Sequence, residues 1–200
     1  MKNILIILII SFAIFAFSGF KSNDIELEWG SKPEDTIESF FEAINTYDFE
    51  KIKALTFEEN IDKIDNLTSG ENKYISNLEE VLKINAEKIS YEILESNVEG
   101  DKASYKVKCT YIDASRQFGE ATGYIINQVI ESSLSGVKLN EEELNKLLAI
   151  VFKTKLPEME EQIIEKPINI SCIRIDKKWY IEDITDEIAD VMLSNIYSLK

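Results

Sequence analysis

Histidine is absent from the 200 residues of this chain. Its absence removes the usual general base at neutral pH, the partner that activates Ser and Cys nucleophiles, and the commonest zinc ligand. Arginine is nearly absent too, because Arg116 and Arg174 are the only two. Acidic residues outnumber basic ones by 37 to 22, for a net charge of −15, and such a surface repels nucleic acid phosphates. We therefore expect no nucleic-acid partner, and any catalysis would have to use carboxylates, Lys or Tyr.

Glycine (7), proline (3) and cysteine (2) are scarce as well. The hydrophobic content of 44% is that of an ordinary globular protein, so the chain is long and apolar enough to fold as one domain without a metal or disulfide staple. Cys109 and Cys172 lie on the apolar faces of two strand-like runs. They would form a disulfide if those strands place them together, and two buried free thiols are the other interpretation. Without histidine they make no zinc site, and we expect neither a metal nor a cofactor.

The first 20 residues read as an export signal. Lys2 precedes the apolar run 4–17, which is shorter than the roughly 20 residues that span a bilayer comfortably. Residues 16–18 suit a signal-peptidase site, and an uncleaved N-terminal anchor is the other interpretation. We expect an extracytoplasmic protein, secreted or anchored to the membrane only through 4–17, with 21–30 as a polar tether.

Hydrophobic periodicity predicts the helices that follow. They are expected over residues 31–47, 48–55 and 73–86, in two segments within 115–160, and around Ile188, Met192, Leu193 and Ile196 near the end of the chain. The polar stretch 66–72 predicts a loop.

Alternation of apolar and polar residues predicts two β-hairpins. Strands are expected over 88–96 and 103–111, with a turn at 99–101, and over 166–175 and 179–184, with a turn at 176–178. The alternation indicates a sheet with one face in water. The predicted class is α+β.

Three segments resemble a known family. Residues 32–44 (KPEDTIESFFEAI) and 47–52 (YDFEKI) resemble the opening helix pair of small exported NTF2-like (cystatin-like) domains of Firmicute lipoprotein-like proteins, and 173–181 (IRIDKKWYI) resembles their closing hairpin. The resemblance implies a cone in which N-terminal helices pack on a curved antiparallel sheet, with a C-terminal helix. It also implies one domain over 31–200 with a helical insertion at about 115–160. Phe20 stands where such a lipoprotein would carry its lipid-attachment cysteine, which puts a lipid tether in doubt.

Aromatic side chains on the predicted strands are the candidate pocket lining. They are Tyr91, Tyr105, Tyr111 and Trp179, and packing in the core explains them as well as a ligand does. The hypothesis is a non-enzymatic extracytoplasmic binding or interaction module, whose partner is an unknown small molecule or a protein of the cell envelope.

Two alternatives depend on carboxylates. A pocket enzyme of the isomerase or dehydratase kind would need a buried acid, and among Glu92, Glu95, Asp113 and Asp183 the last is the best candidate. Calcium would use Asp183, Asp186, Glu187 and Asp190. Because no EF-hand pattern is present and acidic residues favour a helix N-terminus, a structural role explains these four better.

Overall fold

The computed structural model describes residues 32–68, 73–154 and 158–199. The predicted leader, 1–20, and tether, 21–30, lie outside the described residues. The helices are α2 (Pro33–Asn45), α3 (Phe49–Leu55), α4 (Ile61–Thr68), α5 (Lys73–Ala86), α6 (Ser115–Leu134), α7 (Glu141–Thr154) and α8 (Asp186–Met192), with short 3₁₀ turns at Glu58–Asn60 and Tyr197–Leu199. Among the described residues, no helix has the length and apolarity needed to cross a membrane.

Four strands form one antiparallel sheet in the order β1-β2-β3-β4. They are β1 (Ser90–Glu99), β2 (Lys102–Asp113), β3 (Gln162–Ile175) and β4 (Lys178–Ile181). Both predicted hairpins are present, but β3 begins earlier than predicted and β4 ends at Ile181, so that 182–184 are not part of the strand. Together with the helices, this sheet makes the protein an α+β fold, as predicted.

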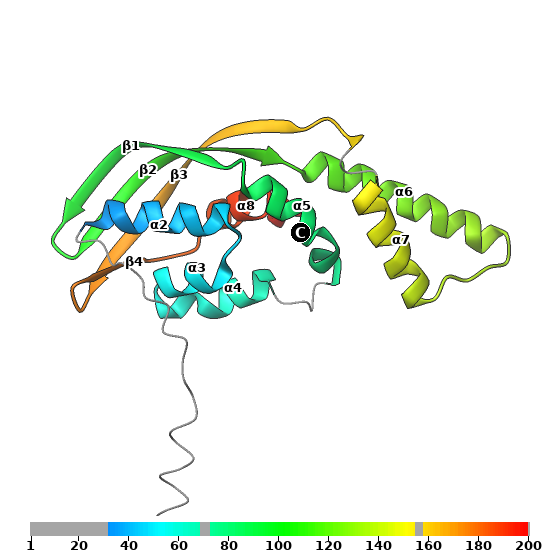
Figure 1. The fold of residues 1–200 in the computed structure, drawn as a ribbon, viewed down its shortest axis with the longest axis horizontal. Coiled ribbons are helices and arrows are strands. Elements are labelled where there is room, and N and C mark those ends of the chain that lie inside the picture. The colour runs from blue at the N-terminus through cyan, green and yellow to red at the C-terminus, as the bar shows by residue number, and fades with distance from the viewer. Residues whose placement is uncertain (1–31, 69–72, 155–157, 200) are drawn as a thin grey trace, which may run out of the picture.

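The helices α2, α3, α5 and α8 lie on one face of the sheet, and α4 packs against α3 (Figure 1). The side chains of Ile37, Phe40, Phe41 and Ile44 on α2 are at most 2% exposed, because they recur at the spacing that keeps one side of a helix toward the core. Side-chain hydrogen bonds join the layers: the Thr36 hydroxyl donates to the carbonyl oxygen of Trp179 at 3.3 Å.

The other face of the sheet is charged. Lys108 pairs with Glu92 at 2.8 Å, and Lys106 pairs with Glu95 at 3.1 Å, both across β1 and β2. Cross-strand pairs of opposite charge suit a solvated face, as the alternation predicted.

Two of the predictions about helices and loops are wrong in part. Helix α4 occupies Ile61–Thr68, so the first residues of the predicted loop 66–72 are helical, while 69–72 lie outside the described residues. The C-terminal helix ends at Met192, so Ile196 is not part of it. Ser194 and Asn195 adopt left-handed backbone conformations with φ of 53° and 64°, which an α-helix does not tolerate.

The turn after α8 connects to the start of α6. The Ala114 amide donates to the carbonyl oxygen of Ser194 at 2.9 Å. From this point α6 runs outward, and α7 returns toward the end of the sheet, so that the pair projects beyond the other helices (Figure 1). The helical region predicted over 115–160 consists of these two helices, α6 and α7.

Candidate functional site: an apolar groove between α6 and α7

Three of the four aromatic residues predicted to line a pocket lie in the core. Tyr105, Tyr111 and Trp179 are 2%, 1% and 2% exposed. Tyr91 is half-buried, and its ring stacks on that of Phe41 with centroids 4.1 Å apart and planes 12° from parallel. The four residues therefore do not meet around one cavity that the structure describes, and ligand binding by them stays a prediction.

Tyr91 lines a shallow hollow at the edge of the sheet. The hollow has a volume of about 410 Å³ and is bounded by Glu38, Phe41, Glu42, Asn45, Ile89, Ser90 and Tyr91. Burial, followed by the charge of Glu38, raises the pKa of Tyr91. Both carboxylates of the hollow are exposed, so neither has the desolvated setting of a buried general base.

Two phenol groups in the core are unusual. The hydroxyl oxygens of Tyr105 and Tyr111 are buried and, among the described residues, have no hydrogen-bond partner. Burial is the main reason that both pKa values are raised; the nearby Glu34 side chain adds to the effect at Tyr105 by hydrogen bonding and charge, and the charge of Asp190 adds to it at Tyr111, which leaves Tyr111 as the clearer case of an unpaired hydroxyl. A buried hydroxyl without a partner is costly, and this is the one polar feature of the predicted pocket residues that the fold does not explain.

The disulfide allowed by the two cysteines does not form. Both thiols are free and buried. Strands β2 and β3 do pair, but Cys109 lies opposite Lys166 while Cys172 lies opposite Ala103. Six residues of strand separate 103 from 109, which is about 20 Å, whereas a disulfide needs Cα atoms within about 7 Å.

The candidate carboxylates are solvated or already hydrogen-bonded. Glu92 and Glu95 lie in the ion pairs of the outer face, and Asp183 is exposed. Burial would raise the pKa of Asp113, but hydrogen bonds from Ser115 outweigh it and lower the pKa. None of these four is buried as the enzyme hypothesis needs, and the pKa of Asp113 is shifted in the opposite direction.

The acidic residues around α8 do not converge either. Asp190 is 3% exposed and accepts hydrogen bonds from the amide and hydroxyl of Ser198 at 3.0 and 2.5 Å. Within the described ranges, no group of three or more His, Cys, Asp or Glu side chains could hold a metal ion.

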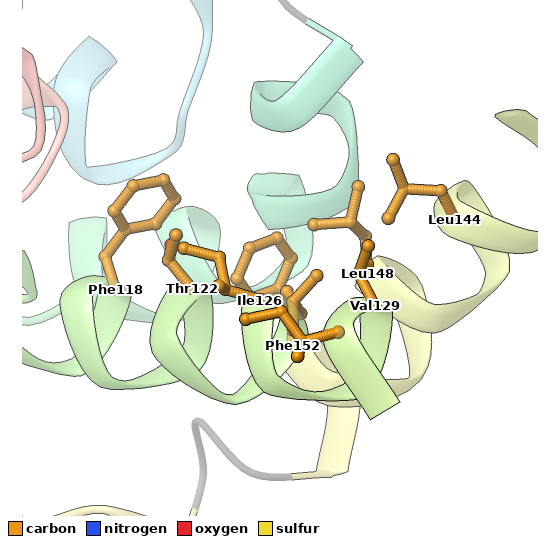
Figure 2. A pocket seen from close by; sticks show the side chains of 9 residues that line it. Phe118, Thr122, Ile126, Val129, Leu144, Leu148 and Phe152 are labelled. Atoms are coloured by element: carbon orange, nitrogen blue, oxygen red, sulfur yellow. The ribbon is translucent and has the colours of Figure 1, made fainter. Parts of the chain in front are cut away.

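A groove opens instead between α6 and α7, where the sequence analysis placed no site. It has a volume of about 420 Å³. Its lining is Phe118, Thr122, Ile125, Ile126, Val129 and Ile130 from α6, and Leu144, Leu148 and Phe152 from α7. Thr122 contributes the only polar side-chain group of the nine. Figure 2 shows side chains of both helices, among them Phe118, Val129 and Leu148, arranged around one opening.

Local interactions set the two helices that frame the groove. The Asp113 carboxylate accepts from the Ser115 amide at 3.0 Å at the start of α6. In α7, the Asn140 side chain accepts from the Glu143 amide at 3.0 Å, and the Glu143 carboxylate accepts from the Asn140 amide at 2.9 Å. This reciprocal pair is a capping box, which satisfies amides that a helix start leaves free.

The base of the groove is firmly packed and its mouth is open. Phe118 and Phe152 stack with centroids 5.9 Å apart, and α7 also rests on α5. Leu148 and Phe152 are 6% and 1% exposed, whereas Ile126 and Ile130 are 53% and 49% exposed. The helices diverge from this base toward the loop that joins them (Figure 1), so apolar side chains near the tip, such as Ile126 and Ile130, stay about half exposed among the described residues.

A signal for the groove is present in the sequence. Apolar residues of α6 fill two adjacent stripes, one through Phe118, Ile125 and Val129 and one through Ile126 and Ile130. A helix that packs on one neighbour needs one such stripe. The additional stripe indicates a second contact, and only the structure shows that nothing in the described chain makes it.

Comparisons with known proteins leave the chain without an assigned family. No protein-family profile matches it, and no curated protein matches it. Among solved structures, it is similar to a crystal structure of a "putative lipoprotein (ycdA)" from Bacillus subtilis subsp. subtilis str. 168, with 14% sequence identity and a TM-score of 0.48. The match covers 79% of this chain and 57% of that one, so the chain spans little more than half the length of that protein. A likeness at this level assigns neither a family nor a function.

Proposed function

We propose that the protein is a non-enzymatic, extracytoplasmic interaction module, and that the groove between α6 and α7 binds an amphipathic helix of a protein partner. The observation that carries the proposal is the unfilled apolar opening between two helices, with Ile126 and Ile130 half exposed at its mouth. Two helices that diverge from a packed base offer a third helix the ridges and grooves against which helices pack.

The chemistry of the lining favours a helix over a polar small molecule. Sites for small molecules usually combine apolar walls with a few placed polar groups that fix the orientation of the ligand. Here Thr122 is the only side chain that offers one. Leu134 and Val137 extend the apolar surface beyond the groove, at 84% and 52% exposure. An elongated apolar strip of this kind fits the side chains that a helix presents at every third or fourth residue.

The proposed location depends on the sequence. The apolar run 4–17 after Lys2 has the pattern of an export signal or anchor. We further propose that the domain is NTF2-like, with α6 and α7 as an insertion. The supporting feature is the placement of α2 and α3 on one face of an antiparallel sheet, with an isolated parallel bridge between Thr56, just after α3, and Ile181 of β4. In such a domain the insertion would add a binding surface outside the cone.

A fluorescent peptide tests this proposal. The probe is a short amphipathic helix of leucine and lysine, titrated with the protein and read by anisotropy. Ile126→Asp places a charge at the mouth of the groove and should weaken binding by at least about tenfold, because burying an unpaired charge costs more than the roughly 1.4 kcal/mol that this factor represents. The matched control is Ile150→Asp, since Ile150 is 59% exposed and lies two residues from Leu148 and Phe152, on the other side of α7.

The two variants carry the same charge, so attraction of the cationic probe to the acidic protein cancels in the comparison. Equal binding by both variants would contradict the proposal. Binding of dodecanoate, sensitive to Ile126→Asp, with no binding of the peptide would overturn the helix as occupant in favour of an acyl chain.

A further inference from the structure

The outer side of α6 carries a stripe that is graded in side-chain size. Gly119 and Gly123 occupy it in the first half of the helix, and Ile126, Ile130 and Leu134 occupy it in the second half. Spacings of three and four residues place them on one side. The three large side chains are 53%, 49% and 84% exposed.

The fold of a single copy does not need either glycine. Among the described residues, the glycines with positive φ are Gly100 and Gly136, so Gly119 and Gly123 do not serve a left-handed turn. A Cβ added at Gly119 or Gly123 would meet nothing within 4 Å, so no internal neighbour requires the space. Each glycine nevertheless destabilises the helix relative to alanine. Glycine within a helix allows another backbone or a ligand to approach the helix backbone closely, because it has no side chain.

We infer, on the basis of the helix-binding function proposed above, that α6 of a second copy of the chain docks on this face of α6, which shares Ile126 and Ile130 with the groove, and runs antiparallel to the first. Positions 119 and 134 are equally far from the midpoint between residues 126 and 127, and so are positions 123 and 130. In an antiparallel pair centred there, Leu134 of each copy lies on Gly119 of the other, and Ile130 lies on Gly123.

The gradation in size selects this arrangement. A parallel pair would place glycine opposite glycine at one end and leucine opposite leucine at the other, which leaves a gap and a collision. The antiparallel pair matches large with small at both ends about a twofold axis, which is the symmetry of a closed dimer. The second copy of α6 in this antiparallel pair also covers Ile126, which lies at the mouth of the groove.

The available area suits such a contact. Ile126, Ile130, Leu134 and Val137 are 53%, 49%, 84% and 52% exposed. Together they expose on the order of 400 Å² of apolar surface, about half of the roughly 800 Å² per partner in a standard stable interface. The polar residues that flank the stripe on α6 would supply the remaining rim.

Sedimentation velocity over a wide range of concentrations tests the dimer. The protein is used in the form that its host produces, as wild type and as Ile130→Asp, Ile150→Asp and Gly123→Leu. The wild type and Ile150→Asp should form a dimer, and Ile130→Asp should raise its dissociation constant by at least about thirtyfold, as for a central interface residue.

Gly123→Leu separates lost contact from lost folding. Leucine has open space at this position in the monomer and favours a helix, so the melting temperature should stay the same or rise. In the dimer it occupies the place of Ile130 from the second copy, so the dimer should be lost. A stable variant that remains dimeric would overturn the antiparallel register.

The result also separates this inference from the function on which it rests. A wild type that is monomeric at every concentration, yet binds the leucine and lysine peptide in a way that Ile126→Asp weakens, would refute the dimer and retain the helix-binding groove. A monomer that binds no peptide would refute both.

Discussion

Substituting Tyr111 with phenylalanine should stabilise the protein. Tyr111 is 1% exposed, and its hydroxyl oxygen has no hydrogen-bond partner among the described residues. Phenylalanine keeps the ring in the same place and removes only the oxygen. An unsatisfied buried polar group costs about 1–3 kcal/mol, so Tyr111→Phe should raise the free energy of unfolding by about 1–2 kcal/mol.

Urea and thermal denaturation measure this change. For a domain of this size, 1 kcal/mol corresponds to a shift of about 2–4 °C in melting temperature, so an increase of roughly 2–8 °C is expected. The dependence of the unfolding free energy on urea should not change, since the same surface becomes exposed. Tyr124→Phe is the matched control, because Tyr124 is 44% exposed and its substitution should change the free energy by less than about 0.5 kcal/mol.

A loss of stability would refute the reasoning, because it would mean that the hydroxyl of Tyr111 has a partner. That result would also bear on function. A polar partner held at this position, such as a bound molecule lost on denaturation, would support the prediction that Tyr111 lines a ligand pocket. A gain in stability identifies the ring as core packing.

Two further predictions concern the pH dependence of stability and the start of α7. Burial raises the pKa of Cys109 and of Cys172 from 9.0 to about 12. Each thiol therefore contributes stability that is complete below about pH 9 and is lost as the pH rises toward 12, at up to about 1.4 kcal/mol per pH unit. Cys109→Ala should make the fall in unfolding free energy between these pH values shallower, and an unchanged slope would contradict burial of the thiol. Asn140→Ala removes the cap of α7 and should cost about 1 kcal/mol, with faster hydrogen exchange in its first turn, while Lys146→Ala, which loses an exposed pair with Glu142, should change neither by much.

The elements of this fold were largely readable from local patterns. The spacing of Ile37, Phe40, Phe41 and Ile44 predicts α2 because a helix repeats every 3.6 residues. Alternation through Tyr105 and Cys109 predicts β2 and its wet outer face because strand side chains alternate sides. These patterns depend on the geometry of a few neighbouring residues, which the order of amino acids determines directly.

Contacts between residues distant in the sequence could not be predicted from such local patterns. Alternation places Cys109 and Cys172 on the inner side of their strands, but the β2–β3 register decides which residues face each other, and it sets the thiols six residues apart. The same limit applies to Tyr111 and Trp179. A sequence pattern shows that their side chains face inward, whereas only the packing of helices against the sheet decides whether a cavity remains there.

The sequence by itself determined the acidic composition without histidine, the α+β class and the apolar surface of α6, and it predicts an export-like leader outside the described residues. The tertiary structure decided where that surface would be used. Because α7 leans on α5 and diverges from α6, Ile126 and Ile130 are left half exposed instead of entering the core. Whether an apolar side chain is buried depends on which distant segments of the chain pack against it. The local sequence does not specify these tertiary contacts.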